Sequence, residues 1–172
     1  VQVPKHDFTG TGKQAIEKAE EWAKDNIVGT HTATDLNGNN YQYNISGNSI
    51  KKFLSSSAVG KSDNLGVHLS VLTKLPEVIE HSVETEIHPD YAKGTDGKRV
   101  EANPVNSNVL VHRLFGAVNI DGKIYRVKTT IREFADANTN ANAHSYEVTE
   151  IELFEAPSAN GENTTSQPLA MT

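Results

Sequence analysis

The sequence VLVHRLFGAVNIDGKIYRVKTTIREFA (residues 109–135) decides the fold class. Two runs rich in β-branched and aromatic residues flank Asp121-Gly122, and an Asp-Gly pair in this setting is typical of a two-residue β-hairpin turn. In the second run, every other side chain from Tyr125 onward is mostly apolar. This alternation predicts a strand with one face on a core. The interleaved positions include three cations: Arg126, Lys128 and Arg132.

A third strand and an earlier hairpin extend this pattern. The segment HSYEVTEIELFEA (residues 144–156) alternates in the same way, but its apolar phase slips once near Thr149 or Glu150, which predicts a β-bulge. Residues 29–46, GTHTATDLNGNNYQYNIS, place an Asn-Gly pair between two strand-like runs and predict a second hairpin. The last third of the chain is therefore expected to be an antiparallel meander of three strands.

Helical periodicity occupies the first half of the chain, on either side of that hairpin. Thr11 and Gln14 have the spacing of a capping box, and the residues that follow place apolar side chains on one stripe. Residues 48–56 predict a short helix. Residues 68–83 return to helical spacing, and Pro76 predicts either a kink or a fresh helix start there. Two polar segments predict exposed loops: residues 58–66 and 88–108.

The length of 172 residues is sufficient for one domain with a sizeable core. The periodic segments predict a single α+β domain over residues 11–156, with N-terminal helices and a β-hairpin packed on a mainly antiparallel sheet. Residues 1–10 are interpreted as a linker or frayed terminus, and residues 157–172 as a polar linker to a further domain. No apolar run approaches the ~20 residues of a membrane span, so no membrane partner is expected.

Composition excludes several kinds of function. The formal net charge is -6, so any phosphate binding must rest on a local basic patch. The absence of cysteine excludes disulfides, thiolate metal sites and a cysteine nucleophile, and it is compatible with a cytoplasmic protein. No Walker loop, GxGxxG, HExxH or GxSxG motif is present. The spacing of the seven histidines indicates no zinc site, and neither a metal nor a cofactor is expected.

Three residues of the predicted sheet have side chains suited to proton transfer: His112, His144 and Tyr146. His112 is in phase with Leu110 and Leu114 on a face that should be buried. The alternative for His112 is therefore a core histidine, hydrogen-bonded to the backbone or to a tyrosine. His144 opens the last strand, where both a general acid-base role and an ordinary solvated histidine are compatible with the sequence.

The cationic row on the second hairpin strand predicts either a phosphate-binding face or an ordinary solvated one. Exposed antiparallel faces commonly carry charged pairs, and Glu147 from the neighbouring strand could neutralise one cation. The functional interpretation adds Lys51 from the helical half of the chain. The predicted phosphate-binding residues are therefore Arg126, Lys128, Arg132 and Lys51. With an imidazole or phenol they would supply the acid, base and fixed cations of metal-free RNA cleavage.

Several motifs, read in order, resemble one known family. They are EEWAKDNIVGT (20–30), NSIKKFLSSS (48–57), LSVLTKLPEVIEHSV (69–83), AVNIDGKIYRVKTTIREF (117–134) and HSYEVTEIEL (144–153). Over roughly residues 11–156 the chain resembles the large polyvalent protein-associated domains of the third type. Those domains occur within very long multidomain proteins of phages and conjugative elements.

The resemblance implies the barnase, EndoU, colicin and RelE-like nuclease fold and, with it, a metal-independent ribonuclease that acts on RNA or tRNA. It also implies partner domains in a larger parent chain, and a bacterial cytoplasmic location or delivery into a recipient cell. Residues 88–108 look longer than the usual link between helix and sheet, and His112 stands where an aromatic residue is expected. No catalytic residue is therefore carried over from the family. A catalytically inactive module that binds protein or nucleic acid remains the alternative.

Overall fold

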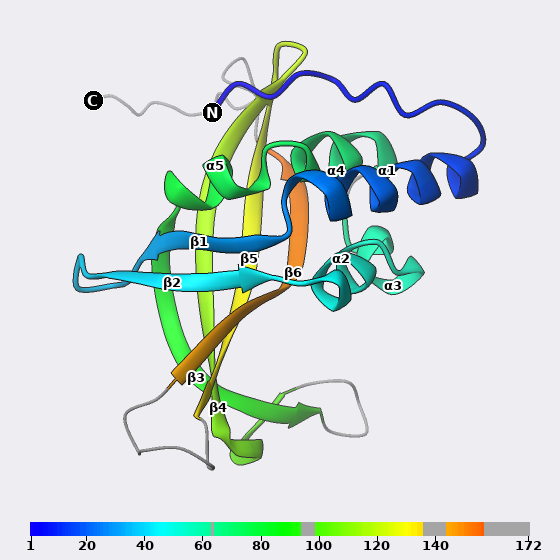
Figure 1. The fold of residues 1–172 in the computed structure, drawn as a ribbon. Coiled ribbons are helices and arrows are strands. Elements are labelled where there is room, and N and C mark those ends of the chain that lie inside the picture. Colours follow the sequence, from blue (N-terminus) through cyan, green and yellow to red (C-terminus); the bar gives the residue numbers. More distant parts are fainter. Residues whose placement is uncertain (63, 94–98, 136–143, 157–172) are drawn as a thin grey trace, which may run out of the picture.

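The computed structural model describes residues 1–62, 64–93, 99–135 and 144–156, with side chains for residues 1–62, 64–90, 109–134 and 146–156. The helices of this part are α1 (Gly12–Asn26), α2 (Gly47–Phe53), α3 (Ser56–Gly60), α4 (Leu65–Leu72) and α5 (Leu75–Glu80). The strands are β1 (Gly29–Thr34), β2 (Asn40–Ile45), β3 (Val83–Lys93), β4 (Arg99–Ile120), β5 (Lys123–Ala135) and β6 (His144–Glu155). The predicted α+β class is confirmed (Figure 1).

The strands form a single mixed sheet in the order β1-β2-β6-β5-β4-β3. Its neighbouring strands pair antiparallel except β2 and β6, which meet in parallel where Asn44 lies opposite Glu147. This parallel contact joins the N-terminal hairpin to the last strand, and the hairpin crosses in front of the other strands in Figure 1. The predicted mainly antiparallel sheet is confirmed.

The turn and the bulge predicted for the meander are both present. Asp121 and Gly122 have φ values of 54° and 85°, the left-handed region that a two-residue hairpin turn requires. Along β5, Thr130 pairs with Glu150, but the next residue pairs with Val148. Thr149 is therefore the extra residue of a β-bulge, at the position where the apolar phase slips.

Two helix predictions are confirmed and one is wrong. Thr11 caps α1 with the predicted capping box, and Pro76 lies in the first turn of a new helix rather than at a kink. The single helix expected over residues 48–56 is instead two helices. Ser55 Oγ accepts the backbone N–H of Ala58 at 3.2 Å and begins α3, which extends into the segment expected to be a loop.

The loop expected over residues 88–108 is mostly strand. β3 and β4 pair antiparallel from Val83 opposite Phe115 to Lys93 opposite Arg99, with several register shifts along the way. β3 is an edge strand of the described sheet, and an edge strand tolerates a proline such as Pro89 because its outer side needs no amide donor. The Pro and Asn residues that predicted a loop therefore lie in an irregular antiparallel pair of strands.

The helices cover one face of the sheet, and the core lies between the two layers. α1, α4 and α5 lie over the upper half of the sheet, while α2 and α3 lie beside β6 (Figure 1). Fully buried side chains come from both layers: Phe53, Leu72 and Ile79 from helices, and Tyr43, Leu114, Ile131, Ile151 and Leu153 from strands. This packing fixes α2 and α3 against the sheet.

Of the two terminal segments expected to lie outside the domain, the structure describes the first. Gln2 bridges to Asn119 of β4, and Val3 donates its N–H to Asn119 O at 2.9 Å with its side chain buried. Residues 1–10, interpreted as a linker or frayed terminus, thus include a short stretch paired with the sheet. Residues 157–172 lie outside the described residues.

Candidate functional site

An open groove of about 510 Å³ lies between the α2–α3 pair and the neighbouring strands β5 and β6. Its walls carry four cationic side chains: Lys51, Lys52, Lys61 and Arg132. Glu150 lies in the same walls, together with the hydroxyl and amide side chains of Asn48, Ser55, Ser57 and Thr149. The described residues therefore form a concave, cationic surface on a molecule whose formal net charge is -6.

α2 directs its two lysines toward this groove because its other side is apolar. Ile50 and Phe53 are fully buried, and Lys51 and Lys52 lie exposed in the last turn. The partial negative charge at a helix C-terminus favours cations in that turn. Neither lysine forms an ion pair with any residue that the structure describes.

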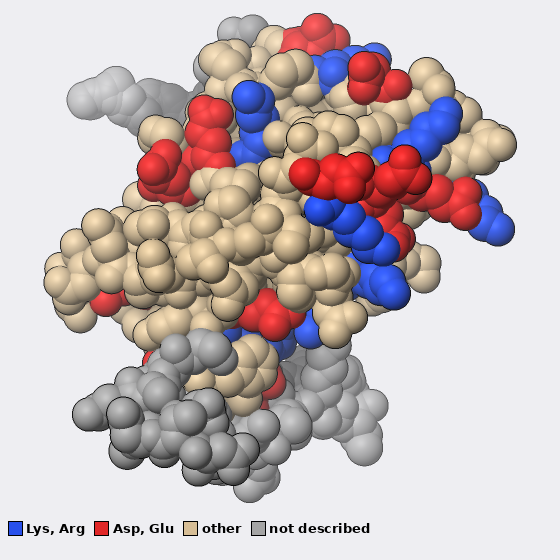
Figure 2. All heavy atoms as spheres, in the orientation of Figure 1, with Lys and Arg blue, Asp and Glu red and all other residues tan. Residues whose placement is uncertain are grey.

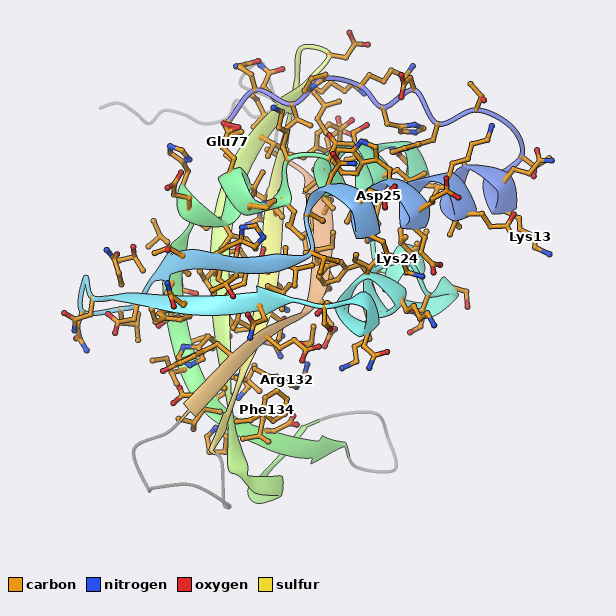
Figure 3. All side chains as sticks on the ribbon, viewed as in Figure 1. Lys13, Lys24, Asp25, Glu77, Arg132 and Phe134 are labelled. Carbon is orange, nitrogen blue, oxygen red and sulfur yellow. The ribbon has the colours of Figure 1, made fainter. Side chains whose placement is uncertain are left out.

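Arg132, which Figure 3 labels on the lower part of β5, is held from several sides. Its Nη1 donates to Thr149 Oγ1 at 2.5 Å and to Glu150 Oε2 at 3.3 Å. Its Nε lies 3.6 Å from Asp90 Oδ2 on β3. Because Thr149 is the bulge residue of β6, the bulge brings a hydroxyl and a carboxylate to the same guanidinium.

Glu150 bridges the helical layer and the sheet. Its Oε1 accepts a hydrogen bond from Lys61 Nζ at 3.0 Å, and its Oε2 accepts one from Arg132. Partial burial opposes ionisation of this carboxyl, but the hydrogen bond and charge of Lys61, aided by Arg132, outweigh burial and lower the pKa of Glu150. Glu150 is therefore an anion at neutral pH.

The predicted phosphate-binding residues separate into two pairs. Lys51 and Arg132 both line the groove, although they come from different layers. Lys128 and Arg126 lie on the same outward face of β5 as Arg132 but do not line it. Lys128 lies 3.7 Å from Glu152, and Arg126 is exposed without an ion pair among the described residues.

The predicted site lacked three charged residues that line the groove: Lys52, Lys61 and Glu150. Lys61 follows α3, in a segment expected to be a loop, and Glu150 was considered only as a position of the bulge. The serine at position 55, three residues before Ala58, is an N-cap signal that would have predicted α3.

His112 lies in a different environment, inside the core. Its Nδ1 is 2.8 Å from Glu84 Oε1, and its Nε2 is 2.7 Å from Glu133 Oε1. The exposed fractions are 4% for His112, 3% for Glu84 and 9% for Glu133, so both carboxylates are buried with the ring. Burial alone would lower the pKa of His112, but hydrogen bonds and charges from the two carboxylates raise it. The raised pKa favours the doubly protonated ring, the form that can donate from both nitrogens, one to each carboxylate.

Two tyrosines and the first hairpin complete this buried cluster. Tyr41 Oη donates to Glu84 Oε1 at 3.0 Å, and the Leu36 N–H donates to Glu84 Oε2 at 3.1 Å. The ring centroids of Tyr41 and Tyr146 are 4.6 Å apart. Burial and nearby carboxylates raise the pKa of Tyr41, and burial followed by Glu133 raises the pKa of Tyr146 to about 12. Both phenols are therefore neutral donors that help to fix the hairpin on the sheet.

Two of the predicted proton-transfer residues, His112 and Tyr146, have described side chains, and neither lines the cationic groove. His112 pairs with Ile131, and the neighbouring residue Arg132 points to the opposite face of β5. Tyr146 lies beside His112, with ring centroids 5.7 Å apart. The backbone of His144 pairs with Ala135, but its side chain lies outside the described residues. The structure thus separates the histidine and tyrosine from the phosphate-binding candidates.

The face of the molecule drawn in Figure 2 is unevenly charged. Lys, Arg, Asp and Glu side chains gather over the helices, whereas the surface over the β1–β2 hairpin is almost free of them in this view (Figure 2). Among the described residues, no group of His, Asp or Glu is arranged to hold a metal ion. No helix of the described part has the length and apolar character needed to cross a membrane.

Comparison with known proteins agrees with the resemblance read from the motifs. Residues 10–159 match the sequence profile of a family described as Large polyvalent protein-associated domain 3. No curated protein and no solved structure matches the chain.

Proposed function

The chain belongs to the Large polyvalent protein-associated domain 3 family, and from this premise we propose that it is a module that binds the phosphate backbone of RNA. One observation carries the proposal: Lys51, Lys52, Lys61 and Arg132 surround a single concave groove. Association with large polyvalent proteins supports a role beside other domains of a longer parent chain.

The chemistry of the groove favours backbone contacts over base contacts. Cations, hydroxyls and an amide are the groups that bind phosphate and sugar oxygens. No aromatic side chain lines the groove, so no described residue there provides a surface on which a base can stack. Binding through such a groove depends little on RNA sequence and strongly on salt.

Metal-independent RNA cleavage is a second candidate function, and Glu150 favours it. An ionised carboxylate beside Lys61 and Arg132 has the components of a base flanked by fixed cations. The assignment of proton transfer to His144, Tyr146 and His112 stays a prediction. For cleavage at this groove, His112 and Tyr146 would have to act from the other face of the sheet.

The test is the affinity of the purified chain for a labelled single-stranded RNA in excess EDTA at low salt. We expect Lys51→Glu/Lys52→Glu to weaken binding at least tenfold, because two phosphate contacts become repulsive, and to reduce the log-log salt slope by about 1.5. Lys13→Glu/Lys24→Glu is the control, since it makes the same charge change on α1 at two residues that do not line the groove.

The outcomes separate the candidate functions. Equal loss of affinity in both double variants would mean that net charge, rather than the groove, controls binding, and the proposal would fail. Cyclic-phosphate ends on the RNA that disappear in Glu150→Gln would support cleavage at the groove. Intact RNA together with Lys51-dependent binding would support the binding module alone.

A further inference from the structure

The groove contains its own anion. Glu150 Oε1 lies 3.0 Å from Lys61 Nζ, and Glu150 Oε2 lies 3.3 Å from Arg132 Nη1. The carboxylate thus lies between two cations, with one oxygen directed at each. A phosphate with its negative oxygens would use the same donors, so Glu150 and a phosphate compete for this position.

Glu150 is held in place in the groove because Arg132, one of its two cationic partners, is itself held by other residues. The guanidinium also donates to Thr149 Oγ1 at 2.5 Å and faces Asp90 Oδ2 at 3.6 Å. The side chains of Arg132 and Glu150 are only 22% and 26% exposed. A ligand that displaced Glu150 would therefore leave a partly buried carboxylate without its cations, which is unfavourable.

Among the described residues, the opposite wall of the groove has no such anion. Lys51 and Lys52 are exposed and form no ion pair with any residue in the described part of the chain. The groove thus has a neutralised half at Lys61 and Arg132 and a free cationic half at the end of α2. A ligand bound to the free half alone remains within reach of the negative charge of Glu150.

We propose that Glu150 sets the ligand specificity of the groove, by excluding small phosphates while admitting a polymer that contacts several cations at once. This inference rests on the proposed RNA-binding function. A small phosphate ion has too few contacts to offset repulsion from the carboxylate. An RNA strand can place its successive phosphates on Lys51, Lys52 and the surface beyond the groove, so it experiences less of the repulsion from Glu150 than a compact phosphate does.

The experiment compares wild type with Glu150→Gln, which keeps the shape and hydrogen-bonding oxygen of the side chain but removes its charge. Inorganic pyrophosphate is titrated into each protein by calorimetry, and labelled single-stranded RNA is titrated in parallel. We expect Glu150→Gln to bind pyrophosphate about tenfold more tightly and RNA only about threefold more tightly.

Glu152→Gln is the matched control. Glu152 lies on the same face of β6, two residues further along, and pairs with Lys128 at 3.7 Å, but it does not line the groove. The control should bind pyrophosphate within about twofold of wild type. Circular dichroism checks the fold of each variant, and Glu150→Ala replaces Glu150→Gln if the latter does not fold.

The possible failures are distinguishable. If neutral variants at position 150 bind pyrophosphate no more tightly than wild type, while RNA binding still depends on Lys51 and Lys52, this inference is overturned and the proposed function stands. If RNA binding is indifferent to those two lysines, the proposed function fails and the inference fails with it. A tenfold gain for Glu152→Gln would likewise overturn it, because position 150 would then not be special.

Discussion

At the scale of single residues, the sequence placed His112 correctly but could not identify its partners. Its phase with Leu110 and Leu114 indicated a buried face, where the structure finds it. Glu84 reaches the ring from β3, beside the register shift between Glu84 and Glu86, and a single sequence does not show which strands pair in this way. Glu133, an acid in phase with buried residues of the same strand, was the one available signal.

The buried imidazolium predicts a particular dependence of stability on pH. Because the folded state raises the pKa of His112, its contribution to the free energy of unfolding is complete below the ordinary value of 6.5 and is lost as pH rises through the folded-state pKa. We expect His112→Leu to lower the free energy of unfolding by about 3–5 kcal/mol near pH 6.5, since two buried carboxylates lose their counter-charge.

Urea denaturation of wild type and His112→Leu at a series of pH values, from near 6.5 upward, measures this effect. The difference between the two proteins should shrink as pH rises. His81→Leu is the control, because His81 is exposed and its ring bonds only a backbone carbonyl among the residues described. A difference that is small at pH 6.5, or that grows with pH, would show that the ring is not held as an imidazolium.

At the scale of elements, the parts with strong local signals were predictable and the parts fixed by pairing were not. The Asp-Gly turn, the capping box of α1 and the bulge at Thr149 all follow from short sequence patterns. α3 has only five residues and no apolar periodicity, so its existence depends on the Ser55 cap and on packing against β6. Because α3 was not predicted, Lys61 was not included in the predicted site.

The turn between β4 and β5 provides a test at this scale. Gly122 has a φ of 85°, and a Cβ added there would meet no atom within 4 Å, so the cost of a side chain is conformational rather than steric. We expect Gly122→Ala to lower the free energy of unfolding by about 1 kcal/mol, measured by urea denaturation.

Gly47→Ala is the matched control for this turn. Gly47 opens α2, does not have a left-handed φ, and also leaves open space for a Cβ. Alanine there should be neutral or slightly stabilising, because it reduces the conformational freedom of the unfolded chain. Equal destabilisation by both variants would contradict a conformational origin for the cost at Gly122.

At the scale of the whole molecule, one long-range pairing creates the cationic groove. The parallel contact of Asn44 with Glu147 brings the end of β2, and therefore α2, beside β6. Ser46 and Ser49 both donate to Glu147 Oε1 at 3.0 Å and fasten the start of α2 there. Net charge and local patterns could not predict this pairing, since its partners lie about a hundred residues apart.

The same pairing explains why the sequence predicted a basic strand and the structure contains a basic groove. Of the three cations predicted on β5, only Arg132 lines the groove, together with lysines from the α2–α3 pair. Lys128 and Arg126 lie earlier in β5 on the same outward face, but they do not line the groove. The groove, and not the strand, is therefore the unit on which the proposed function depends.

Mapping the RNA contact by NMR on the isotopically labelled protein tests the groove most directly. We predict that a short single-stranded RNA shifts backbone amide signals chiefly in residues 48–61, on Thr149 and on Glu150, and that those shifts reverse when salt is added. Shifts centred on the cluster around His112 and Tyr41, or spread evenly over the surface, would contradict the account.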